Sequence, residues 1–414
     1  MKRSFTFIIF AILSTITTAQ WYLQNSLPTE ISFYGVKFIS AKVGWAVGVP
    51  GTIMKTTDGG TTWDVQLHNT NYGLYGISFA DSNTGTVVGG TWNSDSGEGI
   101  ILRTTDGGAT WLKQTSGTTY RLFGIHFTDT KYGVAVGGIG EGISELGIIL
   151  GTTNGGSNWQ PISLIVDCKL NAVHFIDHDN GIIVGNGRII RTTDGGLKWQ
   201  NQDIAFNNLM DVTFTNNNNG IIIGDQQILK TTDGGATWAG ITGFGLHAIS
   251  FSDQYNGTAV GQWGSIQRTT DAGSSWKSQA SGTTKVLYDV SFSDVNNGTI
   301  VGEYGTILRT TNGGITFIGE GKNTTKPQNF VLAQNNPNPF NPSTTISYCL
   351  SSASNVKLIV YNTLGETIEI LENGYRNAGN YSINFNASDL PSGVYFYKLE
   401  AGQFSEINKM ILLK

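Results

Sequence analysis

The sequence predicts an all-β chain, with a seven-bladed β-propeller followed by a small immunoglobulin-like β-sandwich. An octet, Thr-Thr-Asp-Gly-Gly-Thr-Thr-Trp at residues 56–63, returns six times at spacings of 48, 48, 40, 39, 38 and 41 residues. Short runs rich in Val, Ile, Phe and Thr lie between the copies, and glycine supplies 55 of the 414 residues. A fixed period near 40 with four strand-like runs in each period is typical of a propeller blade. After residue 319 the period is lost, which predicts a second domain.

Each octet is predicted to form a tight turn between two strands. Asp58 can accept hydrogen bonds from nearby backbone N–H groups, and Gly59 and Gly60 tolerate positive φ. Trp63 begins the next strand and covers the turn with its ring. The seven Asx positions are Asp58, Asp106, Asn154, Asp194, Asp233, Asp271 and Asn312. Because asparagine keeps the acceptor without the charge, these positions are predicted to be structural.

The octet resembles the Asp box, also called the bacterial neuraminidase repeat. In sialidases and their relatives these boxes lie away from the active site, so the resemblance implies a propeller and little about activity. Over roughly residues 33–317 the complete repeats, with runs such as Leu74-Tyr75-Gly76-Ile77-Ser78-Phe79, resemble the photosystem II stability/assembly factor family. That family is a chaperone-like binder of a membrane subunit, so the resemblance implies the fold and a bias toward protein binding.

The N-terminus is predicted to be a signal peptide at residues 1–19. Lys2 and Arg3 precede an apolar run at 5–16 that is too short to span a bilayer, and cleavage is expected after Ala19. An uncleaved anchor is the alternative. No other apolar run is long enough to cross a membrane, so we expect no transmembrane segment in the mature chain.

The propeller is assigned to residues 20–320. Trp21-Tyr22-Leu23-Gln24 resembles the fourth strand of a repeat but has no octet before it. We expect this strand to pair into the last blade and to close the ring, which removes exposed sheet edges.

Residues 321–329 are predicted to be a linker and 330–414 a sandwich of short alternating strands. The tail resembles the C-terminal sorting domain of type IX secretion cargo. The resemblance is carried by the Asn/Pro-rich stretch at 335–346, by Val360-Tyr361-Asn362-Thr363-Leu364-Gly365, and by residues 378–381, 390–399 and 409–414. It implies handling by the type IX secretion machinery through residues 330–414, then secretion or attachment at the outer cell surface. An ordinary adhesive sandwich is the alternative.

Composition excludes several other classes of function. A net charge of −5 and a pI near 5.6 give no electrostatic reason to expect nucleic acid. Cys168 and Cys349 fall in different predicted domains and make neither a disulfide framework nor a zinc site. His126 and His174 share a phase in adjacent repeats, where a merely polar position is favoured over a metal pair. We predict no metal and no cofactor.

Two sets of residues are candidates for binding an extracellular protein or glycan. The first lies in insertions between strands two and three of the second and third repeats, on the face opposite the octets: Trp92, Asp95, Glu98, Glu141 and Glu145. Tolerated surface insertion is the alternative. The second set is the second residue of strand one in each repeat: Tyr34, Tyr75, Phe123, Asn171, Met210, His247 and Tyr288. Its aromatic members, Tyr34, Tyr75, Phe123 and Tyr288, would suit a peptide or sugar at the channel mouth, although packing between blades is favoured.

A basic residue precedes six of the seven octets: Lys55, Arg103, Arg191, Lys230, Arg268 and Arg309, with Gly151 as the exception. We expect their stems to pack between blades and their heads to pair with nearby carbonyl groups or aspartates. A basic docking ring is the alternative.

A sialidase active site would need three arginines on the face opposite the octets, as that family implies. Four of the six propeller arginines belong to the basic set, which leaves only Arg121 and Arg188. No catalytic residue is therefore predicted. The sequence favours an exported, non-catalytic propeller that serves as a protein- or glycan-binding scaffold. An extracellular glycoside hydrolase of sialidase-like fold is the alternative.

Overall fold

The computed structural model describes residues 21–24, 31–67, 70–91, 97–139, 145–203, 208–242, 245–314, 330–332, 334–335, 338–377 and 379–413. The chain divides into two compact units, one formed by Thr18–Thr316 and the other containing Phe317–Lys414. The predicted signal peptide (1–19) and linker (321–329) lie outside the described residues and stay predictions.

The first unit is a ring of seven four-stranded antiparallel sheets, as predicted. Blade one contains β2 (Ser32–Phe38), β3 (Gly44–Val49), β4 (Thr52–Thr56) and β5 (Asp64–Leu67). Blade two contains β6 (Tyr72–Phe79), β7 (Gly85–Thr91), β8 (Gly99–Thr104) and β9 (Leu112–Gln114). Blade three contains β10 (Arg121–Phe127), β11 (Gly133–Ile139), β12 (Leu146–Thr152) and β13 (Gln160–Val166). Blade four contains β14 (Leu170–Phe175), β15 (Gly181–Gly185), β16 (Arg188–Thr192) and β17 (Gln200–Asp203).

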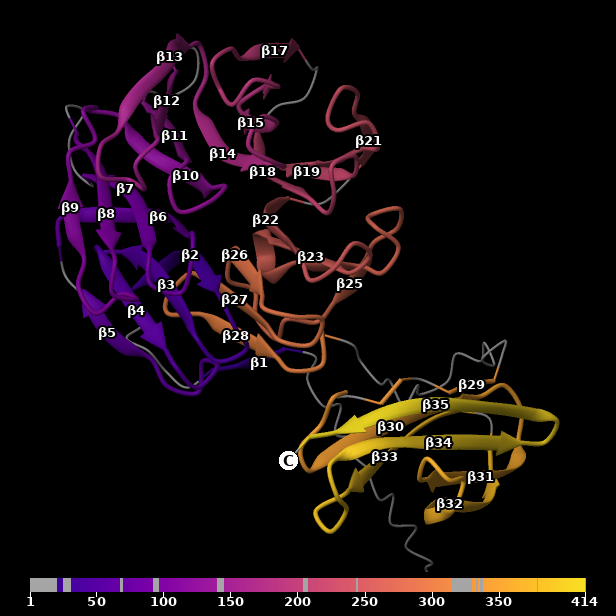
Figure 1. The fold of residues 1–414 in the computed structure, drawn as a ribbon. Helices are drawn as coiled ribbons and strands as arrows, with labels where there is room; N and C mark the ends of the chain where they lie inside the picture. Colours follow the sequence, from indigo (N-terminus) through magenta and orange to yellow (C-terminus); the bar gives the residue numbers. More distant parts are fainter. Residues whose placement is uncertain are drawn as a thin grey trace, which may run out of the picture. The chain divides into compact units, whose positions relative to one another are not determined.

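The remaining blades repeat this order. Blade five contains β18 (Leu209–Phe214), β19 (Gly220–Gly224), β20 (Gln227–Thr231) and β21 (Ala239–Thr242). Blade six contains β22 (Leu246–Phe251), β23 (Gly257–Gly261), the short 3-10 turn η2 (Gln262–Gly264), β24 (Ile266–Thr269) and β25 (Lys277–Gln279). Blade seven contains β26 (Leu287–Phe292), β27 (Gly298–Gly302), β28 (Ile307–Thr310) and the N-terminal β1 (Tyr22–Leu23). The first strand of every blade lies nearest the centre of the ring (Figure 1).

The predicted ring closure is confirmed. Tyr22 pairs with Arg309 and Leu23 with Leu308, so the N-terminal strand is the fourth strand of the last blade. Trp21 is 2% exposed and packs edge-on against Phe292, with ring centroids 5.9 Å apart. Trp63 and Phe38 of blade one make the same contact at 6.0 Å. Trp21 therefore occupies the place of an octet tryptophan in blade seven, where the sequence offers Phe317, a residue outside the described part.

The octets, called boxes below, form the predicted turns. In the first box, the Asp58 carboxylate accepts hydrogen bonds from the Thr62 N–H at 2.9 Å and the Thr62 hydroxyl at 2.7 Å. Gly59 and Gly60 have φ of 77° and 88°, as a tight turn requires. Each box also donates one backbone N–H to the turn between strands one and two of its own blade, as Gly59 does to the Lys42 carbonyl at 2.8 Å. The boxes and these turns thus share one face of the propeller, which we call the box face.

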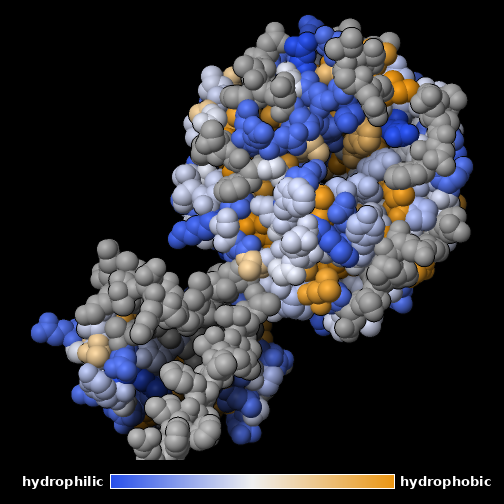
Figure 2. Space-filling model, turned by 180° about the vertical axis from the view of Figure 1, so that it is seen from behind, coloured by the Kyte–Doolittle hydropathy of each residue, from blue (hydrophilic) through white to orange (hydrophobic). Residues whose placement is uncertain are grey.

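The hydrophobic core lies between adjacent blades. One cluster, for example, joins Trp45, Val47 and Ile53 of blade one to Leu74 and Val87 of blade two. Similar clusters of buried side chains occur at the other junctions. On the propeller face seen in Figure 2, hydrophobic residues show at the surface as separate areas among hydrophilic ones.

Basic side chains tie neighbouring blades together at the box face, which confirms the structural interpretation of the basic set. Lys55 Nζ donates to the Gly107 carbonyl of the next box at 2.7 Å. Arg103 Nε donates to the Gly155 carbonyl at 2.6 Å, and Arg191 Nε to the Gly234 carbonyl at 3.2 Å.

The C-terminal unit is a two-sheet sandwich. A three-stranded sheet has the order β29 (Val331–Leu332), β30 (Ser343–Leu350) and β33 (Gly379–Asn386). A four-stranded sheet has the order β32 (Thr367–Arg376), β31 (Ser354–Tyr361), β34 (Gly393–Ala401) and β35 (Phe404–Leu412). Side chains from both sheets form one core, including Ile346, Phe385, Leu358, Tyr397 and Met410. Nowhere in the described ranges is a helix long and apolar enough to span a membrane.

Candidate binding site at the channel mouth

The first strand of every blade contains a β-bulge. In blade one, Phe33 pairs with Gly48 and Gly35 with Val47, so Tyr34 between them has no partner on β3. The same shift occurs in the other six blades, and the unpaired residues are Tyr34, Tyr75, Phe123, Asn171, Met210, His247 and Tyr288. These are the seven residues of the second candidate set. Bulges re-aim a side chain out of the regular pleat, and they are frequent beside functional sites.

Residues on either side of each bulge hold it in place. The residue before it is fully buried in the core, as Phe33 and Leu74 are. The residue after it approaches the next blade so closely that glycine is required in blades one to three. A Cβ on Gly35 would lie 2.8 Å from the Tyr75 carbonyl oxygen, and one on Gly76 would lie 2.7 Å from the Phe123 carbonyl oxygen. Neighbouring bulged residues are thereby brought into contact.

Blades five and seven carry aspartate where blades one to three carry this glycine. The Asp289 carboxylate accepts hydrogen bonds from its neighbour Val290 and, at 2.7 Å, from the Val36 N–H of blade one. Asp211 accepts in the same way from the Ile249 N–H of blade six at 2.9 Å. Loss of hydration raises the pKa of both carboxyl groups to about 7. Their hydrogen bonds identify them as links between blades.

Five of the seven bulged residues form a continuous series of ring contacts through blades six, seven, one, two and three. Ring centroids are 5.6 Å apart for His247 and Tyr288, 4.4 Å for Tyr288 and Tyr34, 5.4 Å for Tyr34 and Tyr75, and 5.3 Å for Tyr75 and Phe123. All five are partly exposed. We call these five residues the aromatic crescent. Each ring packs on its neighbours and is partly exposed, so the crescent stays a candidate binding surface.

The other two bulged residues complete the ring without aromatic groups. The Asn171 side-chain amide donates to the Leu209 carbonyl at 2.8 Å and contacts the Met210 sulfur at 3.9 Å. The site therefore has an aromatic arc and a shorter arc of one amide and one thioether.

The crescent lies at the end of the channel opposite the box face. His247 contacts the Gln262 side-chain amide at 2.9 Å, and the Tyr288 hydroxyl donates to Glu303 at 3.4 Å. Gln262 and Glu303 both follow strand two, on the hairpins that lead to strand three. The next residue in each hairpin is aromatic and exposed: Trp263 is 82% exposed and Tyr304 is 58% exposed.

Trp263 and Tyr304 also have backbone conformations that bulky residues rarely adopt. Their φ angles are 57° and 51°, in the left-handed region. Such strain concentrates at ligand-binding positions, where the surrounding structure maintains it. Sequence reasoning missed both residues; the available signal was an aromatic residue followed by glycine at the same turn of two successive repeats.

The predicted loop acids are only partly described. Trp92, Asp95 and Glu141 lie outside the described residues. Glu98 forms an exposed ion pair with Lys113 at 2.7 Å, and Glu145 accepts from the Asn186 amide at 2.6 Å and from the Lys169 N–H at 3.3 Å. Both described carboxylates are therefore bonded to neighbouring side chains or backbone groups of the protein.

His126 and His174 pack on each other, with ring centroids 4.8 Å apart. Desolvation lowers the pKa of His174 to about 4 and holds that of His126 well below its usual value, so both rings are neutral at pH 7. The described residues hold no group of three or more His, Cys, Asp or Glu side chains placed to bind a metal ion.

Comparison with known proteins places this fold in a family. Residues 13–160, 152–242 and 203–281 match the family described as photosynthesis system II assembly factor YCF48, and together they span more than half of the chain. Residues 336–413 match the secretion system C-terminal sorting domain. A curated relative, the photosystem II assembly protein Ycf48 of Thermosynechococcus vestitus, is 39% identical over 56 residues, which is 13% of this chain and 16% of the relative.

Two solved structures share the architecture at low sequence identity. The structure titled "YCF48 bound to D1 peptide" has a TM-score of 0.58 and 21% identity, and the match covers 72% of this chain and 98% of that one. The GH74 xyloglucanase from Xanthomonas campestris has a TM-score of 0.55 and 13% identity over 80% of this chain and 59% of its own. These likenesses concern the fold. By its matched repeats, the chain belongs to the photosynthesis system II assembly factor YCF48 family, and it carries a C-terminal secretion sorting domain.

Proposed function

We propose that this protein is an exported, non-catalytic propeller that binds an extended segment of a partner protein at the aromatic crescent. The observation that carries the proposal is the bulge in all seven blades, which brings five ring side chains from five blades into one partly exposed surface. Tyrosine suits such a surface, because it offers a large contact area at a low cost in side-chain entropy.

The hydrogen-bonding groups around the crescent suit a peptide. Glu303, Gln262 and Asn171 supply carboxylate and amide groups beside the aromatic surface. Aromatic contacts with a few placed polar groups are the usual composition of a peptide or small-ligand site. One structural neighbour, YCF48 bound to D1 peptide, carries a peptide on the same fold, which supports this use of the scaffold.

Two observations favour binding over catalysis. The described loop acids Glu98 and Glu145 are paired with Lys113 and Asn186. Arg103, Arg191 and Arg309 bond to carbonyl groups at the box face and are remote from the crescent. We further propose that the sorting domain directs type IX export and leaves the propeller outside the outer membrane, where its partner is an extracellular protein.

A peptide array probed with the full chain, alongside a glycan array, tests the binding proposal. Tyr75→Ala should weaken peptide binding by about tenfold or more, since a buried tyrosine at an interface is worth about 1–2 kcal/mol or more. Tyr255→Ala is the matched control. Tyr255 is 55% exposed, and it lies in the turn between β22 and β23 on the box face, away from the crescent. Equal loss in both variants, or undiminished binding by Tyr75→Ala, would refute a site at the crescent.

Glycan binding is the second candidate, favoured by the exposed and strained Trp263 and Tyr304. Exposed aromatic rings stack on the apolar faces of sugars. A glycan signal that Trp263→Ala removes and Tyr75→Ala spares would move the site to the two hairpins. Turnover of such a glycan by the wild-type chain would support the hydrolase alternative.

A further inference from the structure

Six of the seven blade junctions on the box face are occupied by a basic side chain from the residue before a box. Lys55, Arg103 and Arg191 donate to the Gly107, Gly155 and Gly234 carbonyls of the following blade. The other three also reach the next blade. Lys230 Nζ donates to the Ser274 hydroxyl, and Arg309 donates to the Ala41 carbonyl. An Arg268 side-chain nitrogen lies 3.4 Å from the point where a Cβ added to Gly313 would lie. Arginine supplies four of the six.

The junction between blades three and four lacks this side chain. Gly151 has the register of the basic residues, because it pairs with Val134 and Gln160 as Arg103 pairs with Thr86 and Leu112. A pocket of about 450 Å³ lies at this junction, and Gly151 is among the residues that line it. We call it the Gly151 pocket.

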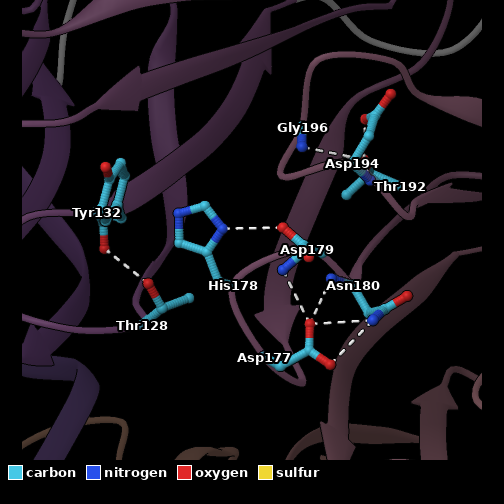
Figure 3. A network of polar contacts seen from close by, with 9 residues as sticks. All are labelled: Thr128, Tyr132, Asp177, His178, Asp179, Asn180, Thr192, Asp194 and Gly196. Carbon is cyan, nitrogen blue, oxygen red and sulfur yellow. Dashed lines mark hydrogen bonds and ion pairs between the residues drawn. The ribbon is translucent and has the colours of Figure 1, made fainter.

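The walls of the Gly151 pocket suit the stem of a long side chain. Val134, Ile162 and Phe175 supply apolar surface, and the Tyr132 and His178 rings meet edge to face with centroids 4.5 Å apart. The His178 ring lies between Tyr132 of blade three and Asp179 of blade four, to which its Nδ1 is bonded at 2.9 Å (Figure 3).

The far wall of the Gly151 pocket is the fourth box, including Asp194 and Gly195. Gly195 is the counterpart of Gly107, Gly155 and Gly234, whose carbonyls accept from the basic residue of the preceding blade. Within the described ranges, the structure records no donor to the Gly195 carbonyl. His178 Cε1 lies 3.6 Å from the Cβ position of Gly195, but the His178 ring comes from blade four itself and leaves the pocket open.

Charge around the pocket favours a cation. The carboxylate of Asp194 lines the pocket, and Asp179 is bonded to the ring of the lining residue His178 at 2.9 Å. Asp129 and Asp177 each lie next in sequence to a lining residue, Thr128 and His178. Hydrogen bonds from their own turns keep Asp129 and Asp194 ionised, with each pKa below its usual value. Lys131 and Lys198 are the lysines in the same turns, so the four aspartates outnumber them.

We propose that the Gly151 pocket receives an arginine side chain of a partner protein, whose guanidinium bonds to the Gly195 carbonyl. The protein itself supplies the precedent, because a basic group occupies the other six junctions. The aliphatic stem lies against Val134, Ile162 and Phe175. This site is on the opposite face from the aromatic crescent and does not depend on binding there.

Histidine NMR on the full chain tests this inference with a defined probe. The chain contains five histidines, so selective ¹³C labelling gives five resolvable ring signals, and His178→Gln assigns the one that matters. N-acetyl-arginine-N′-methylamide is added, and the corresponding citrulline compound, which has the same shape without the charge, is the matched probe. We expect a saturable shift of the His178 signal with arginine and about tenfold weaker binding of citrulline.

Three variants separate the pocket from general surface binding. Gly151→Arg places in this junction the side chain that four other junctions carry, so it should abolish the saturable shift. A Cβ at residue 151 would lie 2.3 Å from Ile162 Cδ1 and 2.6 Å from Ile162 Cγ1, so the Ile162 side chain has to rotate in every Gly151 variant, including the alanine variant named next. Gly151→Lys is the second filled variant, and Gly151→Ala should keep binding. An unchanged His247 signal, from blade six, reports that each variant is folded.

The proposal is overturned if the Gly151→Arg and Gly151→Lys variants bind arginine as the wild type does, or if citrulline binds equally well. It is also overturned if inorganic phosphate shifts His178 saturably and arginine does not. Should neither filled variant fold, the comparison of arginine with citrulline on the wild-type chain still decides, because only a cation site discriminates between them.

Discussion

The rings of Tyr34 and Tyr288 stack with centroids 4.4 Å apart, and they belong to the first and last blades of the ring. Asp289 links the same two blades through the Val36 N–H. The junction where the ring closes therefore has side-chain links on its inner strands in addition to the outer β1–β28 pairing.

This stacking predicts a measurable coupling between the two residues. In a double-mutant cycle with Tyr34→Ala and Tyr288→Ala, we expect an interaction of about 0.5–1.5 kcal/mol in the free energy of unfolding. Denaturant unfolding of the four chains measures it. Phe123 and Tyr288 are not neighbours in the crescent, so the pair Phe123→Ala and Tyr288→Ala serves as the control. A coupling near zero for Tyr34 and Tyr288 would contradict the stack.

Loss of the Trp21 side chain should destabilise the folded propeller strongly. Its ring is 2% exposed, packs on Phe292, and donates from Nε1 to Gln279 at 2.9 Å. We expect Trp21→Ala to lower the free energy of unfolding by about 3–5 kcal/mol, the usual cost of emptying such a site. Leu23→Ala is the control, because Leu23 is 66% exposed in the same strand. Similar small effects in both variants would show that β1 does not hold the ring closed.

The boxes predict an acid-dependent part of the stability. Hydrogen bonds from Thr110 lower the pKa of Asp106 to about 2, and similar bonds lower those of Asp233 and Asp271 to about 2. Because the folded-state pKa is below the unfolded value of 3.8, this stability is present above pH 4 and is lost as the pH falls toward 2.

Asp106→Asn tests the box prediction by imitating the third and seventh boxes, which carry asparagine naturally. The variant should unfold with a smaller pH dependence between pH 4 and 2, measured as the denaturant midpoint at several pH values. Asp64→Asn, at an exposed site after a box, is the control. A pH dependence identical to that of the wild type would argue against a role for the box carboxylate.

The sorting domain predicts where the protein is found. Deletion of residues 336–413 should stop passage across the outer membrane and leave the propeller in the periplasm, as detected by cell fractionation and immunoblotting. Deleting the predicted linker 321–329 alone is the control and should leave export intact. Equal amounts of the shortened and complete chains outside the cell would contradict the prediction.

The sequence was a good guide wherever local chemistry decides the structure. The boxes are turns because Asp58, Gly59 and Gly60 act within eight residues, and the fixed period then gives seven blades. The pairing of Tyr22 and Leu23 with the last blade was also predictable, because that strand has no box of its own. The role of Trp21 as the tryptophan of the seventh box was not, since Phe317 stands at that position in the sequence.

The candidate site was predictable as a set of residues and not as a geometry. A bulge depends on which residues pair across two strands, and the sequence around Tyr34 gives no sign that its partner is skipped. The left-handed backbone of Trp263 and Tyr304 likewise depends on hairpin geometry. Gly151 stood out as an exception to the basic set, but only packing against blade four turns that exception into a pocket.

Trp21 and Gln279 are 258 residues apart in sequence, which has a consequence for how this propeller can be cut and rejoined. Because the first strand belongs to the last blade, the molecule is already a natural circular permutant of seven complete repeats. Placing residues 21–24 directly after the seventh box would restore an uninterrupted repeat and convert the longest-range strand pairing of the ring into a local hairpin. Such a chain should fold faster, because its last blade forms from local contacts and only the junction of blades seven and one remains long-range.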